Sequence, residues 1–363
     1  MIKIAERFKV SHFLVFYLIH SLQYGVGVLG FQRIIADKSG RDAWIAVILS
    51  GIVVHISLWM IYKILKDSNG NIMTVHKAVF GKWIGNTLSA LLACYFLLVA
   101  ITVLRTYIEI IEVWMFPDLN VWLFTFVFLL LVYYIIRGGF RVVTGISFFG
   151  IILPIYLFLT FLFPLQFSDL RNLLPVFNHS VKDLLVSTKS MSLTVIGFEA
   201  LLVFYPFIKN ADKSKKWAHL AVATSTVVYT FIMIITLVYF SEEQLQKNVW
   251  ATLTMWKIVE MPFVERFEYV GIANWCLIIL PNVCLTIWCA SRCLKDSFKF
   301  KQKYTLIVIL LITYFANSLS RTRDEISLMN DIIGQLGFYI LIAYIPMLFL
   351  ITIINRKVKE NKA

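Results

Sequence analysis

The chain has 363 residues, of which 60% are hydrophobic and 15% are charged, and its mean hydropathy is +0.79. Soluble domains carry about 25% charged residues, so this composition excludes an ordinary soluble protein and indicates a polytopic membrane protein. The net charge of +13 does not indicate nucleic-acid binding, because lysine and arginine concentrate in alternate loops and at the termini. We therefore predict no nucleic-acid partner.

Ten segments approach the roughly 20 apolar residues that cross a bilayer. The connections between them are short, apart from polar stretches at 166–186 and 241–265, and no segment has the composition of a linker. We predict an all-helical polytopic membrane protein with a single transmembrane domain over residues 1–363. The predicted spans are 10–34, 43–62, 83–114, 120–136, 142–165, 187–208, 217–240, 267–291, 304–319 and 332–354.

The placement of basic residues indicates how the chain crosses the membrane. Lysine and arginine concentrate at both termini and in the loops near 63–82, 137–141, 209–216 and 292–303, whereas acidic residues concentrate in the other loops. Cytoplasmic loops carry the excess of basic residues, so both termini are predicted to be cytoplasmic. The same basic loops face the anionic lipid of the bilayer.

The first span contains the stretch QYGVGVLGFQR, in which three glycines, Gly25, Gly27 and Gly30, lie close together. Each glycine in a helix interior costs about 1 kcal/mol relative to alanine, which predicts a break at Gly25-Val26-Gly27. Broken backbone survives at that depth only inside protein or beside a wet cavity, where its freed amides suit a carboxylate. Close helix packing through small residues is the alternative interpretation.

The third predicted span carries Arg105 and Glu109 in its second half. Their i, i+4 spacing puts both side chains on one helix face, which predicts a local ion pair. We interpret it as a structural or gating pair rather than as a direct contact to a ligand.

The sixth predicted span places Gly197 and Glu199 close to its centre. A charged carboxylate there costs about 2.5–3.5 kcal/mol on insertion scales, so Glu199 is expected to face the bundle interior and to be paired or protonated. Gly197 predicts a second break, and interrupted segments in corresponding positions of two halves indicate a transporter-type binding site. A structural hydrogen bond between helices is the alternative role for Glu199.

Broken first and sixth helices in a chain of ten spans resemble the amino acid–polyamine–organocation (APC) transporter superfamily, whose fold has two inverted five-helix repeats. Further motifs narrow this resemblance: GKWIG at 81–85, NLLPVF at 172–177, IGFE at 196–199 and ERFE at 265–268. With GVGVLGFQR in the first span, this ordered series is similar to the B subunits of spore germinant receptors over nearly the whole chain. Gln32 departs from that pattern, which has proline before the arginine matched by Arg33.

The resemblance implies a subunit that recognises a small nutrient, an amino acid or a sugar, in the spore inner membrane together with a larger A subunit and a lipoprotein C subunit. In transporters of the superfamily, the break in helix 1 binds the substrate carboxylate through amides, and the break in helix 6 binds the amino group through carbonyls. The matching residues here are Gly25, Val26, Gly27, Thr194, Gly197, Phe198 and Glu199.

Two other functional classes stay open at this point. An autonomous amino acid permease needs the same broken helices. A membrane-embedded enzyme needs a second acid, base or metal site beside Glu199, and the sequence offers none. We therefore predict no enzymatic activity, no cofactor and no metal site, and uptake by the purified chain distinguishes a permease from a receptor subunit.

Overall fold

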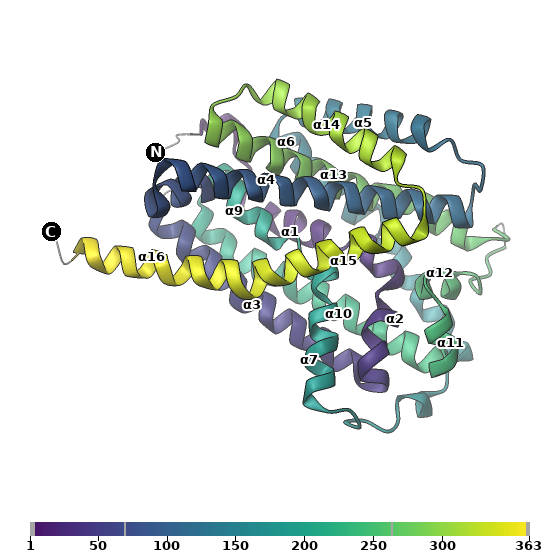
Figure 1. Cartoon of the computed structure of the whole chain (residues 1–363). Helices are drawn as coiled ribbons and strands as arrows, with labels where there is room; N and C mark the ends of the chain where they lie inside the picture. The colour runs from purple at the N-terminus through teal and green to yellow at the C-terminus, as the bar shows by residue number, and fades with distance from the viewer. Residues whose placement is uncertain (1–3, 69, 263, 361–363) are drawn as a thin grey trace.

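The computed structural model describes residues 4–68, 70–262 and 264–360, and within these ranges the regular structure is helical, with no β-strand (Figure 1). This confirms the predicted all-helical fold class. Seven helical stretches are long and apolar enough to cross a membrane, and shorter apolar helices occur beside them. Each of the ten predicted spans is occupied by helix, while the count of ten crossings stays a prediction.

The first half of the chain contains six α-helices, of which the last continues as 3-10 turns. They are α1 (Val15–Gln23), α2 (Gly27–Ser39), α3 (Ala43–Ser68), α4 (Ile72–Trp114), α5 (Val121–Arg137) and α6 (Phe140–Ile152), with the 3-10 segment Leu153–Phe167. The α-helical part of the fifth predicted span ends at Ile152, two residues before Pro154, which lacks an N–H group for the helix ladder.

The second half begins with helix fragments and ends with long helices. They are α7 (Val181–Ser190), α8 (Ser192–Val195), α9 (Leu201–Phe204), α10 (Lys215–Tyr239), α11 (Glu242–Lys247), α12 (Ala251–Trp256), α13 (Phe267–Phe298), α14 (Gln302–Leu319), α15 (Arg323–Tyr339) and α16 (Ile345–Glu360). Helix α7 begins earlier than predicted because Ser180 and Asp183 form a reciprocal capping box at its start. Short 3-10 turns flank α9, and one π-helical turn joins α15 to α16.

Helices α4 and α13 run side by side through the middle of the bundle (Figure 1), and they pack against each other along their lengths. The apolar window of α13 is 72% buried, whereas that of the last span, α15–α16, is only 22% buried. Helix α16 projects past its neighbours, and the start of the described chain lies at the same end of the bundle (Figure 1). The outer helices therefore enclose a central α4–α13 pair, against which both broken helices are placed.

Candidate functional site

The first break lies between α1 and α2 at Tyr24, Gly25 and Val26, which belong to neither helix, and Tyr24 has a non-helical ψ of 79°. The surrounding helices satisfy the carbonyl groups that the break frees. Asn282 of α13 donates to the Ser21 carbonyl at 2.7 Å, and the Tyr229 hydroxyl of α10 donates to the Gln23 carbonyl at 2.7 Å. The break predicted from the glycines is thus present and is held open by side chains from two other helices.

Two amide groups of the same break are left without partners. In the described part of the chain, the N–H groups of Val26 and Gly27 make no hydrogen bond, whereas the Gly25 N–H faces the Tyr229 oxygen and the Gly25 carbonyl accepts a hydrogen bond from the Trp275 indole at 3.3 Å. The two free amides lie at the N-terminal end of α2, where the helix dipole adds partial positive charge. Because these two donors are free, the break favours an anionic group such as a carboxylate.

The second break separates α8 from the turn before α9. Gly197 has a φ of +112°, and a Cβ at this position would lie 2.5 Å from the Leu22 Cβ. Both observations require glycine, since other residues rarely adopt that conformation. Gln23 joins the two breaks because its Nε2 donates to the Val195 carbonyl at 2.8 Å, while the carbonyls of Thr194 and Ile196 accept no hydrogen bond from a described residue.

Glu199 closes its own break instead of facing a cavity. The side chain is only 1% exposed; one carboxylate oxygen accepts the Gly197 N–H at 2.7 Å, and the other accepts the Tyr95 hydroxyl at 2.8 Å. Phe198 is also 1% exposed and belongs to the hydrophobic core. Neither residue lines the two cavities beside the breaks, and Glu199 reaches the other nominated residues only through its bond to Gly197.

The remaining nominated residues share one small cavity of about 30 Å³ between the breaks. It is lined by Gly25, Val26, Gly27, Thr194 and Gly197, among others. Such a volume corresponds to the share of about one water molecule in the liquid. A ligand the size of an amino acid therefore requires the helices around this cavity to move apart.

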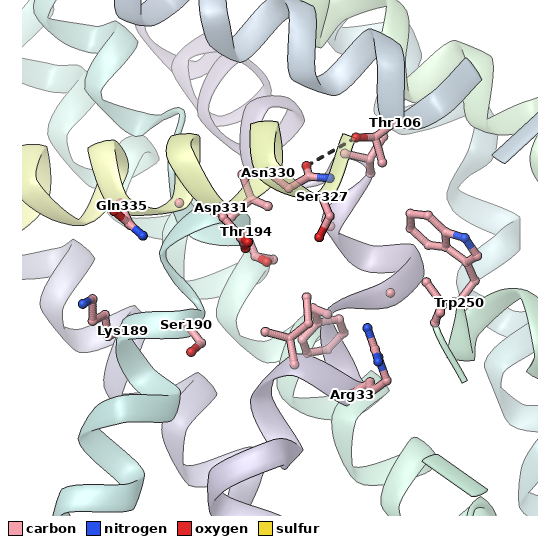
Figure 2. A pocket seen from close by; sticks show the side chains of 18 of the residues that line it. Arg33, Thr106, Lys189, Ser190, Thr194, Trp250, Ser327, Asn330, Asp331 and Gln335 are labelled. Atoms are coloured by element: carbon pink, nitrogen blue, oxygen red, sulfur yellow. Dashed lines mark hydrogen bonds between the residues drawn. The ribbon is translucent and has the colours of Figure 1, made fainter. Parts of the chain in front are cut away.

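A second cavity of about 360 Å³ continues from the first, since Val26, Gly27 and Thr194 line both. Figure 2 shows Arg33 and Trp250 on one side of it, Lys189 on the other, and Asn330 and Asp331 of α15 along its roof. Lys189 and Asp331 are exposed, so this cavity is open to the surface.

The sequence missed most of the residues of this larger cavity. Trp250 lies in the loop before α12 and Asp331 in the middle of α15, neither carries a motif, and only the folded chain brings them beside the first break. Arg33 belongs to the motif series in the first span but was not nominated for a role; its Nε atom is buried and has no hydrogen-bond partner.

The predicted pair between Arg105 and Glu109 is replaced by two other pairs. Arg105 binds the Glu112 carboxylate at 2.9 Å and the Ser320 carbonyl at 2.6 Å. Glu109 accepts two hydrogen bonds from Arg323 of α15, at 2.6 and 2.7 Å. The spacing allows the local pair, but one terminal nitrogen of Arg323, from a distant part of the chain, contacts both Glu109 oxygens.

Gln32, which departs from the family pattern, has a structural role. Its Nε2 donates to the Thr252 hydroxyl at 2.7 Å, and that hydroxyl donates to the Val28 carbonyl at 2.8 Å. The side chain thereby fastens α2 to α12. Among the described residues, no group of three or more His, Cys, Asp or Glu side chains is arranged to hold a metal ion.

The sequence was compared with protein families and with known proteins. The sequence matches the protein family described as "Spore germination protein" over residues 9–326. It is 46% identical to the spore germination protein GerQB of Bacillus cereus over 99% of this chain and 100% of that protein. It is 24% identical to the spore germination protein YndE of Bacillus subtilis (strain 168), over 92% and 93% of the two chains.

Solved structures show what the fold is similar to. The structure of MhsT in complex with L-phenylalanine has a TM-score of 0.63 and 14% identity, covering 94% of this chain and 97% of that one. A Na⁺-coupled sialic acid symporter in a substrate-bound, outward-open state also has a TM-score of 0.63, at 13% identity, covering 93% and 79%. These likenesses confirm the transporter-like fold, and the sequence matches show that the chain belongs to the family of spore germination proteins.

Proposed function

We propose that this protein is the transporter-like membrane subunit of a germinant receptor. It binds a small nutrient between the two helix breaks and signals to partner A and C subunits in the spore inner membrane, with both termini cytoplasmic. The family match and the relatives' printed names support the role in spore germination. The broken helices and the cavities beside them support the binding of a small molecule.

The two unpartnered amides of Val26 and Gly27 carry the proposal. They offer donors to a carboxylate, while the free carbonyls of Thr194 and Ile196 across the small cavity offer acceptors to an ammonium group. An amino acid has both groups, so the geometry favours an amino acid over a neutral sugar. The L-phenylalanine in the MhsT title is consistent with this ligand class.

The size difference between the two cavities supports a signalling step. A ligand enters the cavity of about 360 Å³ and reaches the breaks only if the cavity of about 30 Å³ expands. The Gln23 contact to Val195 and the Tyr95 contact to Glu199 cross this region. Ligand binding therefore rearranges helices α2 and α8 relative to α4, and this rearrangement is what partner subunits detect.

An autonomous amino acid permease is the second candidate, favoured by the fold shared with the sialic acid symporter. Two assays with radiolabelled amino acids distinguish the receptor subunit from the permease. Binding of each of the twenty amino acids is measured with the purified protein in nanodiscs, and uptake of each is measured in proteoliposomes. Saturable binding without uptake supports the receptor subunit, and uptake supports the permease. If no amino acid binds, the proposed ligand class is wrong.

Gly27→Val is the site variant for this experiment, because a side chain at Gly27 meets Thr194 at 3.1 Å and fills the small cavity. We expect the dissociation constant to rise at least tenfold. Gly145→Ala in α6 is the matched control, since no atom lies within 4 Å of its added Cβ. Equal affinity in both variants would remove the helix breaks from the binding site.

A further inference from the structure

A separate cavity of about 330 Å³, called the side cavity below, lies where α4 ends and α13 begins. Its walls are Val113 and Trp114 at the end of α4, Asn248–Trp250 before α12, then Thr254, Lys257 and Arg266. Val249 and Trp250 also line the larger cavity beside the first break. The two cavities are therefore neighbours that share one wall.

The side cavity has an excess of positive charge, because its lining contains two basic residues and no carboxylate, and among the residues that the structure describes only Arg266 pairs with an acidic neighbour, Glu268. Lys257 lies over the Trp114 ring, with its Nζ 4.7 Å from the ring centroid, and makes no ion pair with a described residue. Arg266 uses its Nε to bind Glu268 at 2.9 Å, and its side chain is 54% exposed. Its terminal nitrogens make no hydrogen bond within the described part of the chain, so both residues retain free donors.

The wall between the two cavities has hydrogen bonds on one side and close packing on the other. Thr254 donates its hydroxyl to the Asn248 side chain at 2.9 Å, and Asn248 donates to the Gln244 carbonyl at 2.7 Å. On the other side of the wall, a Cβ on Gly30 would lie 2.5 Å from the Val249 carbonyl oxygen. The absence of a side chain at Gly30 thus lets α2 pack closely against Val249 in the shared wall.

We propose that the side cavity is an outer receiving site for a small carboxylate, with an indole ring against which a planar apolar body can lie. Free donors on Lys257 and Arg266 bind the carboxylate, and Trp114 and Trp250 supply apolar surface. Under the function proposed above, on which this extension rests, the ligand of the main site is itself a carboxylate. The side cavity then concentrates that ligand beside the larger cavity and speeds its association.

Benzoate is a suitable probe, because it combines a carboxylate with a planar ring. The protein is labelled with 5-fluorotryptophan in neutral phosphatidylcholine nanodiscs, and Trp114→Phe and Trp250→Phe assign the two fluorine resonances. We expect benzoate to shift the Trp114 resonance saturably and benzyl alcohol to leave it in place. A shift of equal size with benzyl alcohol, or no shift with benzoate, overturns the proposal.

Charge variants test which groups bind the probe. Lys257→Gln combined with Arg266→Gln is expected to raise the benzoate concentration at half-maximal shift at least fivefold. Lys247→Gln is the matched control, because Lys247 is exposed, paired with Glu243 and outside the cavity. Equal titrations in the charge variant and the control would contradict the proposed role of Lys257 and Arg266.

A phospholipid phosphate offers the same negative charge as a carboxylate. Nanodiscs that contain phosphatidylglycerol distinguish the two sources. We expect benzoate to titrate Trp114 equally in both lipids. If phosphatidylglycerol alone shifts the resonance and blocks benzoate, the occupant is a lipid headgroup and the proposal of a solute site is wrong.

The proposals for the side cavity and for the main site between the breaks can be tested separately. In the Gly27→Val background the main site is closed, and we expect the benzoate titration of Trp114 to persist unchanged. Loss of the titration in that background would show that the side cavity is no separate site. With the main site intact, the double charge variant is expected to lower the association rate of the amino acid that binds there at least threefold at low salt, with an unchanged dissociation rate.

Discussion

Asp42 is a fully buried carboxylate that anchors a distant loop. Its oxygens accept the backbone N–H groups of Phe177, Asn178 and His179 at 2.7, 2.8 and 3.1 Å, and the His179 ring lies 3.2 Å away. The loop positions helix α7, which carries Ser190 and Lys189 into the larger cavity. A single side chain in the short connection between α2 and α3 therefore fixes one wall of the candidate site.

Asp42→Asn is expected to destabilise the protein by about 1–3 kcal/mol, because an amide nitrogen replaces an acceptor and faces backbone donors that stay unsatisfied. The midpoint of thermal unfolding in detergent measures this loss, and faster hydrogen exchange at Phe177–His179 locates it. Asp37→Asn is the control, since Asp37 is half-exposed and paired only with the exposed Lys38. Equal shifts in both variants would mean that the loop does not depend on Asp42.

Glu199 provides a second test at the scale of one residue. Glutamine at this position can accept the Gly197 N–H and donate to the Tyr95 oxygen, so Glu199→Gln is expected to cost less than about 1 kcal/mol. Glu199→Leu leaves a buried N–H and a buried hydroxyl without partners and is expected to cost about 1–3 kcal/mol for each. The midpoint of thermal unfolding is measured for both variants. If glutamine lowers it as much as leucine does, the hydrogen bonds alone do not explain the role of Glu199 and its carboxylate is required.

The sequence predicted that Glu199 faces the interior but not what it binds. Its two partners are Tyr95, far away in α4, and the N–H group of Gly197, two residues before it. A hydroxyl that approaches from another helix leaves no periodic signal in the sequence. The hydrogen bond between helices that was named as the alternative for Glu199 is present, as the bond from Tyr95, and a role in ligand binding stays a prediction.

At the scale of helices and turns, the positions of the helix breaks were predicted correctly from the glycines. The glycines at 25 and 27 predicted the first break, and Gly197 predicted the second. Local backbone preference decides such positions, so they can be read from the sequence. The pair between Arg105 and Glu109 was predicted by the same local reasoning and was wrong, because Arg323 of α15 lies nearer to Glu109 once the helices pack.

Gly197→Ala is expected to destabilise the protein by about 2 kcal/mol or more. The φ of +112° strains an alanine, and its Cβ would meet Leu22 at 2.5 Å. Gly145→Ala is the matched comparison, because Gly145 is helical and has no neighbour within 4 Å of the added Cβ. There we expect no loss, and a gain of up to about 1 kcal/mol from helix propensity. Similar melting points for both variants would contradict the break at Gly197.

At the scale of the whole molecule, the basic loops and the larger cavity lie on opposite sides of the predicted topology. The loops richest in lysine and arginine, near 209–216 and 292–303, lie on the predicted cytoplasmic side, which also holds the termini. The larger cavity is lined from α2, α7, the loop before α12 and α15. Its residues at the start of α15 and in the loop before α12 lie on the opposite side of the predicted topology. A nutrient that arrives from outside the cell membrane would thus meet the open cavity first.

Single-cysteine variants in a background without native cysteines test this orientation. In right-side-out vesicles, a membrane-impermeant maleimide is expected to label Lys182→Cys, at the start of α7, and to leave Lys213→Cys unlabelled until the vesicles are opened. Both positions are exposed, so access and not burial decides the result. The reverse pattern would overturn the predicted topology.

Labelling of Asp331→Cys tests both the predicted topology and the path of the ligand to the candidate site. Because Asp331 is exposed and lines the larger cavity, we expect labelling from the same side as Lys182→Cys. An amino acid that binds between the breaks is expected to slow this labelling several-fold, since ligand entry fills the cavity or draws α15 towards α2. Labelling at Lys182→Cys is the control and keeps its rate. Slowing at both positions would indicate a general change at the surface, and slowing at neither would separate the larger cavity from the ligand's path.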